Sequence, residues 1–546
     1  MTIEQKLGIK VPEVLLPDNK VNMRKWAVIA CDQYTSNLEY WREVSHIVGS
    51  APSVLHMILP EAYLDASDRD DRIAHAKTVM KQYIEDEVLV QLPRGIILVE
   101  RQTSVGKRKG LMFCVDLEEY DFKPKNKSLI RATENTVIER IPPRMDLRRS
   151  AVLESSHIIL LMNDEEDSVI GPVYRKKESL YSLYKFELMQ TGGQVSGWFI
   201  DNEEEINEIL ESILNLKKND KMLFAVGDGN HSLATAKAIW DEAKEDLSEE
   251  EKKDHPLRYA LVEIVNLYDP GISFEPIHRV VFNVEPSRLI VDLMEILKSK
   301  GYNTKVIYSR MKGESTDKMQ VINFVTKEST GRIEILNPKF ENEIETLQDI
   351  LDDYMAKNDK VKLDYIHGEE AFDSLSRQYD CIGFIMPALN KDKLFDIVEK
   401  NGLLPQKSFS LGEPNEKRYY IECRLIVPAT QKQTEEVAVE EKAIKENIKL
   451  EEKEAMAFEE TAEIEAPKGE KAKAKKKKAK VQEAKVEEIQ EEAIAEENKT
   501  DNEVKPIIEE IEIEEVLLKG RKEKTKKAAA KKPKKEKNIE IEFISE

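Results

Sequence analysis

The segment that decides the fold is residues 222–243, MLFAVGDGNHSLATAKAIWDEA. Its first five residues, Met222–Val226, form an apolar run of the length expected for a buried strand. Gly227 and Gly229 then permit a tight turn, and apolar positions recur at helical spacing over His231–Ala243. The segment therefore predicts a strand, a sharp loop and an amphipathic helix, an arrangement typical of mixed α/β proteins.

The loop after this strand has the composition of a phosphate-binding turn. Gly227 and Gly229 let the backbone approach a ligand closely, Asn230 is a favourable N-cap, and the helix directs free N–H groups at the loop. Asp228 and His231 add an acid and an imidazole, so either could act as a base, and Asp228 could hold a metal ion. The alternative is an ordinary connector, because Asp-Gly is a common turn dipeptide.

A phosphate site usually needs a cation, and this loop has none of its own. Ser232 follows the histidine, and Lys237 lies about 10 Å further along the helix. Glu134 could act as an acid–base group or bind Mg²⁺, or it could be a solvated loop residue. His278 heads an apolar strand and could contact the ligand or be structural. The candidate cations elsewhere in the chain are Arg131, Arg144, Arg148, Arg149 and Arg279.

Outward from this segment, apolar strand-like runs alternate with amphipathic helices through residue 428. The predicted helices are 38–48, with Ser36 and Glu39 as a capping box, 69–88, 145–154, 203–216, 287–298, 342–355 and 391–400. The predicted strands are 26–31, 95–101, 110–116, 157–162, 258–267, 278–282, 319–325, 381–386 and 418–426. We expect one mixed α/β (α+β) body over residues 1–428, with a possible domain seam near residue 285.

Residues 429–546 differ sharply in composition from this body. Glu, Lys and Ala dominate, and Phe458 and Phe543 are the only aromatic residues. Such a segment buries too little apolar surface to offset the entropy of ordering its backbone, so we expect a disordered tail. It could be a charged low-complexity segment or form coiled coil. Its basic blocks, 471–480 and 522–537, could contact nucleic acid or a partner protein.

The composition of the whole chain excludes several classes. A net charge of -21 argues against generic nucleic-acid binding by the whole protein, so any such contact is expected through the tail only. The four cysteines have no Cys-x-x-Cys spacing and the histidines are scattered, so we expect free thiols and no zinc site. We expect no haem or flavin either. No signal peptide or membrane-spanning run is evident, which predicts a cytoplasmic protein. The sequence does not indicate an oligomeric state.

Several stretches resemble an uncharacterised bacterial family, domain of unknown function 1015, which carries a SpoOJ/ParB-like label. They occur in the family's order and span nearly the whole body. The resemblance implies that Lys407 and Ser408 belong to the binding residues. The matching stretches are Trp26–Tyr34, Arg131–Arg144, Gly227–His231, Phe274–Val280 and Leu404–Ser408.

More distantly, the loop resembles the ParB/sulfiredoxin group, which includes free serine kinases and nucleotide-binding segregation proteins. There a similar strand–loop–helix element binds nucleotide phosphates. Two departures stand out: Ser232 replaces an arginine frequent in relatives, and Asn230 replaces the catalytic cysteine of sulfiredoxin, which argues against sulfinic-acid repair.

Three hypotheses follow from these residues and from the resemblance. The first is a nucleotide-dependent phosphotransferase or nucleotide hydrolase that acts on a small molecule, with Mg²⁺ as a possible cofactor. In it, residues 227–231 hold phosphate, and Asp228 or Glu134 serves as metal ligand or base. The second is a non-catalytic, ParB-like, nucleotide-responsive binding protein whose tail contacts nucleic acid or a partner protein. The third is a scaffold.

Overall fold

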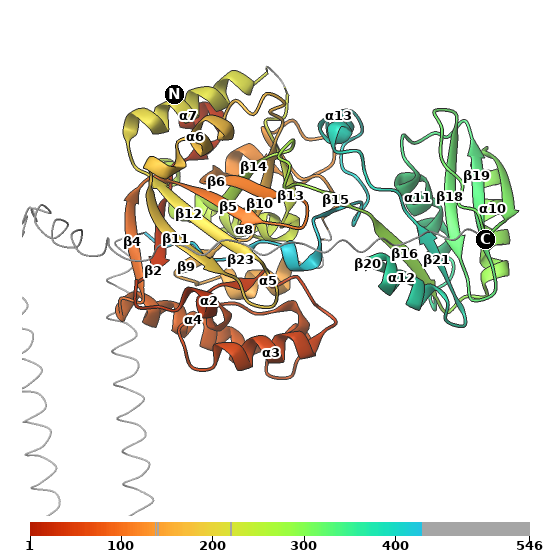
Figure 1. The fold of residues 1–546 in the computed structure, drawn as a ribbon, viewed down its shortest axis with the longest axis horizontal. Coiled ribbons are helices and arrows are strands. Elements are labelled where there is room, and N and C mark those ends of the chain that lie inside the picture. Colours follow the sequence, from red (N-terminus) through yellow and green to blue (C-terminus); the bar gives the residue numbers. More distant parts are fainter. Residues whose placement is uncertain (137, 139–140, 219–220, 429–546) are drawn as a thin grey trace, which may run out of the picture. The chain divides into compact units, whose positions relative to one another are not determined.

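The computed structural model describes residues 1–428 except 137, 139–140 and 219–220. Predictions about the tail, 429–546, lie outside the described residues. Within the body the predicted mixed α/β class is confirmed, since several sheets are interleaved with helices (Figure 1). The helices are α1 (Ile3–Leu7), α2 (Met23–Trp26), α3 (Leu38–Val48), α4 (Arg69–Glu85), α5 (Ile141–Arg148), α6 (Ile170–Arg175), α7 (Glu203–Leu216), α8 (Asn230–Ala243), α9 (Glu251–Asp254), α10 (Pro286–Ser299), α11 (Glu343–Met355), α12 (Glu369–Ser376) and α13 (Leu394–Asn401).

The largest sheet has ten strands and carries the predicted loop. In order across the sheet they are β11 (Tyr181–Glu187), β12 (Gln194–Ile200), β5 (Ile96–Gln102), β6 (Lys107–Asp116), β14 (Tyr259–Asn266), β10 (Ile159–Met162), β13 (Phe224–Asp228), β8 (Ile130–Arg131) and β7 (Tyr120–Asp121), while β1 (Ile9–Lys10) pairs with β6. The pairs β10–β14, β13–β8 and β7–β8 are parallel and the rest antiparallel.

Both faces of this sheet are buried, which explains the continuous apolar runs in its central strands. In β5, Ile96 and Leu98 join one apolar core, and Ile97 and Val99 join the other. Helices α7 and α8 cover the first face, and α2 and α3 contribute Trp26 and Trp41 to the second core. The strand β13 and the helix α8 are thus held by packing on the same sheet.

A second sheet, of six strands, lies between residues 277 and 385. Its order is β17 (Asn303–Tyr308), β19 (Thr330–Leu336), β18 (Met319–Val325), β21 (Cys381–Ile385), β16 (Ile277–Phe282) and β20 (Lys362–His367). It has a core of its own, in which α10 and α11 pack through residues such as Leu293 and Leu347. The seam near residue 285 stays a prediction.

After the second sheet, the chain returns to its N-terminal part. The strand β22 (Ser410–Leu411) pairs with β15 (Phe274–Glu275), and β23 (Tyr419–Tyr420) pairs with β3 (Val28–Ile29). A four-stranded sheet then joins β4 (Leu89–Arg94), β2 (Glu13–Pro17), β24 (Cys423–Leu425) and β9 (Leu153–Ser155). This return brings residues 419–425 to strands from the first 160 residues.

Several local predictions were wrong. The predicted strand 26–31 is only Val28–Ile29, because Trp26 ends α2. The N-cap of α3 is Asn37, which accepts from the Tyr40 amide, so the Ser36 capping box does not form. In place of the predicted helix 145–154, the helix α5 covers residues 141–148. It ends earlier than predicted because residues 153–155 pair with β24 as a strand. The predicted strand 418–426 is split into β23 and β24.

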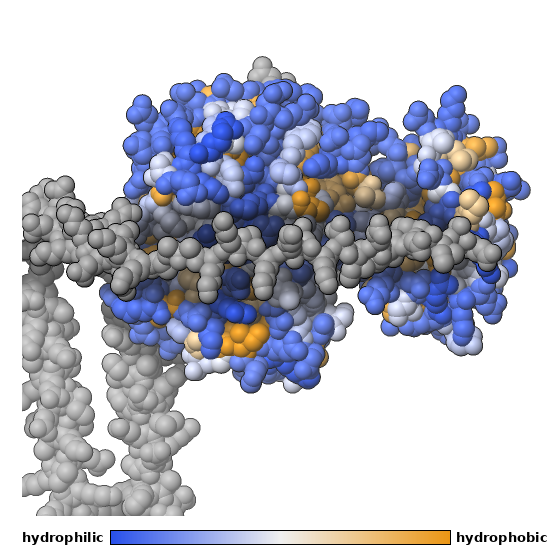
Figure 2. All heavy atoms as spheres, viewed as in Figure 1, coloured by the Kyte–Doolittle hydropathy of each residue, from blue (hydrophilic) through white to orange (hydrophobic). Residues whose placement is uncertain are grey.

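Most large apolar side chains of the body are buried in its cores, and polar side chains cover most of the visible surface. The face in Figure 2 is largely hydrophilic, with apolar side chains in small separate groups.

All four cysteines are free thiols, and three of them are buried. No helix in the described part of the chain has the length and apolar character needed to cross a membrane.

Candidate functional site

The loop between β13 and α8 is shaped by its two glycines. Gly229 has φ +79° and is the N-cap of α8, and its carbonyl accepts from the Leu233 amide at 3.0 Å. The predicted N-cap, Asn230, is instead the first helical residue, because only glycine adopts this left-handed conformation without strain. A Cβ at Gly227 would lie 2.8 Å from Leu161 Cγ. Both glycines therefore have a packing reason to be present.

Replacing Gly229 by valine should destabilise the fold. The left-handed φ alone costs about 1–3 kcal/mol for a branched residue, and the new Cβ would lie 3.1 Å from Ile158 Cα. Gly301→Val is the matched control, because Gly301 has φ +80° with no atom within 4 Å. Denaturant unfolding should show a larger loss of unfolding free energy for Gly229→Val. Equal losses would contradict a role for the Ile158 contact.

The carboxylate of Asp228 pairs with a lysine that is far away in the sequence. Lys417 Nζ lies 3.1 Å from Asp228 Oδ2, and both side chains are largely buried. Asp228 Oδ1 also accepts from the Gly229 amide at 3.0 Å. The cation that the loop itself lacks is thus supplied by the segment before β23.

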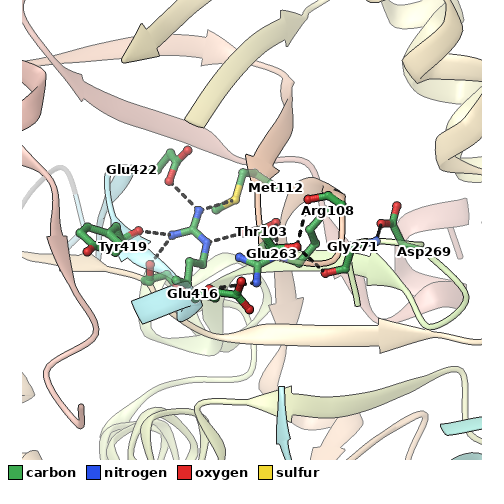
Figure 3. Close-up of polar contacts among 12 residues, drawn as sticks. Thr103, Arg108, Met112, Glu263, Asp269, Gly271, Glu416, Tyr419 and Glu422 are labelled. Carbon is green, nitrogen blue, oxygen red and sulfur yellow. Dashed lines mark hydrogen bonds and ion pairs between the residues drawn. The ribbon is translucent and has the colours of Figure 1, made fainter. Parts of the chain in front are cut away.

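The neighbour of Lys417, Arg418, anchors this segment to the large sheet. Its guanidinium lies 2.6 Å from both Glu263 Oε2 and Glu422 Oε2, and Nη2 is 3.0 Å from Met112 Sδ. These partners surround it in a fully buried network (Figure 3). Burial by itself would lower the pKa of Arg418, but the two glutamates raise it. Breaking such a network is costly, so it fixes the backbone that carries Lys417.

An aspartate, a histidine and a serine lie beside the same loop. His157, between β9 and β10, is buried, and its Nε2 is 3.3 Å from Ser232 Oγ and 3.8 Å from Asp32 Oδ2. A Ser–His–Asp triad needs the serine and the acid on opposite ring nitrogens. Here both face Nε2, so the arrangement is not a nucleophilic triad. Cys31 is no nucleophile either, because burial raises the pKa of its thiol to about 12.

Two lysines create a positive field at Asp32. Burial opposes its ionisation, but His157, the Gln33 amide, Lys407 and Lys417 outweigh burial and lower the pKa of Asp32 to about 2. On β20, burial and the charges of Lys417 and Lys407 lower the pKa of His367 to about 3. We call Asp32, His157, Asp228, Ser232, Lys407 and Lys417 the Asp228 cluster. Its Asp228–Lys417 pair and its Ser232–His157 contact lie at the start of α8.

Glu134 is used by the structure to hold the segment that carries Lys407. Its carboxylate accepts from the backbone amides of Lys407 and Ser408 at 2.9 Å and of Phe409 at 3.3 Å. Burial raises the pKa of Glu134, while Lys407 and these amides oppose the rise. Arg279, fully buried, donates to the Gln406 carbonyl at 3.4 Å. Four predicted residues, Glu134, Arg279, Lys407 and Ser408, therefore meet around one turn.

The other predicted residues are distributed differently. His231 lies in the first turn of α8 and its carbonyl accepts from Thr235. Arg144 pairs with Glu61 beside a cavity that also reaches His157. Arg131 lines another hollow, with Lys221 and Glu399. His278 accepts from the Met386 amide at 3.1 Å and faces a hollow on the second sheet, where burial lowers its pKa to about 4.

The two residues predicted to bind a metal have other partners. Both oxygens of Glu134 accept from backbone amides, and both oxygens of Asp228 are engaged by Gly229 and Lys417. Among the described residues, no group of three or more His, Cys, Asp or Glu is placed to hold a metal ion. The donor set of Asp228 and Glu134 therefore does not fit Mg²⁺.

Sequence reasoning did not single out Asp32, His157 or Lys417. A signal was present for Asp32, because it follows an apolar strand as Asp228 does. His157 lies two residues before the first residue of the strand β10. Lys417 lies in a charged run with no pattern that separates it from other lysines.

The model of the family described as "Protein of unknown function (DUF1015)" matches residues 15–354, well over half of the chain. The chain therefore belongs to this family, as its sequence resemblance implied. No curated protein matches it.

Among solved structures, similar chains include a mutant free serine kinase in complex with AMP, at 11% identity and TM-score 0.34, over 57% of this chain and 91% of that one. A conserved hypothetical protein from Pyrococcus furiosus has 12% identity and TM-score 0.31, over 56% and 90%. A truncated SbnI from Staphylococcus aureus has 10% identity and TM-score 0.29, over 58% and 83%. Likenesses this weak assign no ligand to this chain.

Proposed function

We propose that this chain binds a phosphate-bearing small molecule, with a nucleotide as the leading candidate, at the Asp228 cluster. The observation that carries the proposal is that Lys417 Nζ lies 3.1 Å from the carboxylate of Asp228, next to the N-terminus of α8. Lys407 and Lys417 also favour the ionised form of Asp32. A helix N-terminus presents free N–H groups, and two lysines supply the positive charge that a phosphate needs.

The same cluster supports transfer of a phosphoryl group to a small acceptor, or to water. Phosphoryl transfer depends chiefly on positioning and on neutralising charge at the phosphate oxygens, which Lys407 and Lys417 would do. An ionised carboxylate that accepts the proton of the attacking hydroxyl completes such sites. Asp32 is our candidate for this role, because its carboxylate lies 3.8 Å from His157 Nε2, which contacts Ser232, and its lowered pKa keeps it ionised at neutral pH.

The second candidate is a nucleotide-responsive binding protein without turnover, in keeping with the ParB-like label. It is favoured by the contacts of Asp228, because the carboxylate that the loop itself offers is already held by Lys417 and by the Gly229 amide. In this version the tail, 429–546, contacts nucleic acid or a partner protein.

The test is a thermal-shift screen of the full chain against ATP, ADP, AMP and pyrophosphate, each with and without Mg²⁺. A ligand at one hundred times its Kd should stabilise the fold by about 2.7 kcal/mol through mass action. Release or transfer of phosphate, measured in parallel, separates the enzyme from the binding protein. If no compound raises the unfolding temperature under either metal condition, both candidates fail.

A further inference from the structure

A hollow of about 540 Å³ lies beside the β8–β7 edge of the large sheet, and none of its described lining residues belongs to the Asp228 cluster. Its wall is formed by the loop between β7 and β8, by the end of β8 and by the end of α13. The volume is in the range of ~300–1,000 Å³ that is usual for small-molecule sites. We call it the Arg131 hollow. Its charged lining residues are Lys125, Lys127, Arg131, Lys221, Glu399 and Lys400.

Arg131 presents an unpaired guanidinium end to this hollow. The side chain is only 6% exposed, and its Nε donates to the Ser128 carbonyl at 2.9 Å, which fixes its direction. Nη1 and Nη2 have no hydrogen-bond or ion-pair partner among the described residues, and both stay accessible to solvent. Polar groups of buried side chains are normally paired, so an accessible and unpaired end indicates that an acceptor is supplied by a ligand.

The charges around the Arg131 hollow point to the same kind of ligand. Glu399 is the single acid among the described lining residues, and its oxygens are engaged by Lys221 Nζ at 3.3 Å and by the Met222 amide at 3.1 Å. The other three lysines and Arg131 have no carboxylate partner in the described part of the chain. Four cations therefore remain unbalanced in one hollow, although the whole chain carries a net charge of -21.

The number of free cations indicates phosphate groups. A phosphate group carries a charge of about -1.5 to -2 at neutral pH, so two linked phosphates balance four cations. The guanidinium of Arg131 can form two parallel N–H bonds to one phosphate, and lysines bind phosphate as point charges. No aromatic side chain is among the described lining residues, so the hollow has no surface on which a nucleobase would stack.

We propose that the Arg131 hollow binds a compact molecule with two linked phosphate groups and no nucleobase. One phosphate lies on Nη1 and Nη2 of Arg131, and the other lies among the three unpaired lysines. Lys221 takes no part, because Glu399 neutralises its charge. The site is separate from the nucleotide site proposed at the Asp228 cluster and does not depend on it.

Calorimetry on the full chain without nucleotide tests this site, with inorganic pyrophosphate as the probe. Pyrophosphate should bind at least ~10-fold more tightly than orthophosphate or citrate. Arg131→Met should weaken its binding by roughly 10- to 100-fold, and the double variant Lys125→Gln with Lys127→Gln by roughly 2- to 30-fold. Lys123→Gln with Lys305→Gln is the matched control. It removes two exposed lysine charges outside the hollow and should bind as the wild type does.

Hydrogen–deuterium exchange shows where the probe binds and keeps the test decisive if Arg131→Met does not fold. Pyrophosphate should slow amide exchange at residues 123–131 and 398–403. Protection confined to residues 227–233 would place pyrophosphate at the Asp228 cluster and overturn the second site alone. The second site is also overturned if the wild type binds no pyrophosphate, if citrate binds equally well, or if the control loses as much affinity as the lysine variant. Pyrophosphate binding in the hollow with no nucleotide binding would overturn the proposed function alone.

Discussion

Replacing Lys417 by methionine should weaken nucleotide binding by roughly 10- to 100-fold, since a hydrogen bond to a charged group contributes about 1.5–3 kcal/mol. Methionine retains the length of the lysine side chain and removes its charge. The effect should appear in the Kd measured by calorimetry for whichever nucleotide the screen identifies. Lys221→Met is the control, because Lys221 also pairs with a carboxylate, 3.3 Å from Glu399, but is half-exposed and lies outside the Asp228 cluster.

A loss of binding must be separated from a loss of stability. Lys417 is buried against Asp228, and removing one partner leaves an uncompensated charge that costs about 3 kcal/mol. The double variant Asp228→Asn with Lys417→Met removes both charges, so it should regain most of this stability. Its nucleotide affinity should stay low. If the double variant binds as the wild type does, Lys417 is only a structural partner of Asp228.

Local pattern was sufficient to predict most single elements. The helices 38–48 and 203–216 and the strand 319–325 occur where apolar periodicity predicts them. The errors arise where long-range pairing overrides local preference. Residues 153–155 continue a helical pattern but are paired with β24, more than 260 residues later, and no local signal reports such a partner.

In the candidate site, too, features set by neighbouring residues were predicted, and features set by long-range contacts were not. The loop 227–231 and its acid were recognisable because strand, glycine and helix signals are adjacent in the sequence. The partner Lys417 was not, because 189 residues separate it from Asp228 and only the packing of Arg418 against Glu263 brings it there. Glu134 was predicted as a chemical group, whereas the structure uses its carboxylate to hold the turn 407–409. The sequence shows which side chains have reactive groups, whereas the tertiary contacts determine where each group lies and which partners it has.

Replacing Asp32 by asparagine should have the largest effect on turnover. We expect phosphoryl transfer or phosphate release to fall by ~10²–10⁴-fold, as is typical for the loss of a general base. Nucleotide affinity should change far less, because Lys407 and Lys417 remain in place. Asp68→Asn is the matched control, since Asp68 is a surface aspartate paired with Arg72. A rate for Asp32→Asn within a factor of three of the wild type would remove Asp32 from the mechanism.

The pH dependence of the unfolding free energy tests independently whether Asp32 is ionised in the folded protein. The pKa of Asp32 is lowered to about 2 in the folded protein, below the ordinary value of 3.8, so its ionised form stabilises the fold by about 2 kcal/mol. This contribution is fully present above pH ~4 and is lost as the pH falls to ~2. The difference in unfolding free energy between the wild type and Asp32→Asn should therefore be constant above pH ~4 and shrink below it. If this difference in unfolding free energy does not change between pH 5 and pH 2, His157 and the two lysines do not hold the carboxylate of Asp32 in its ionised form. The electrostatic argument for the site would then be contradicted.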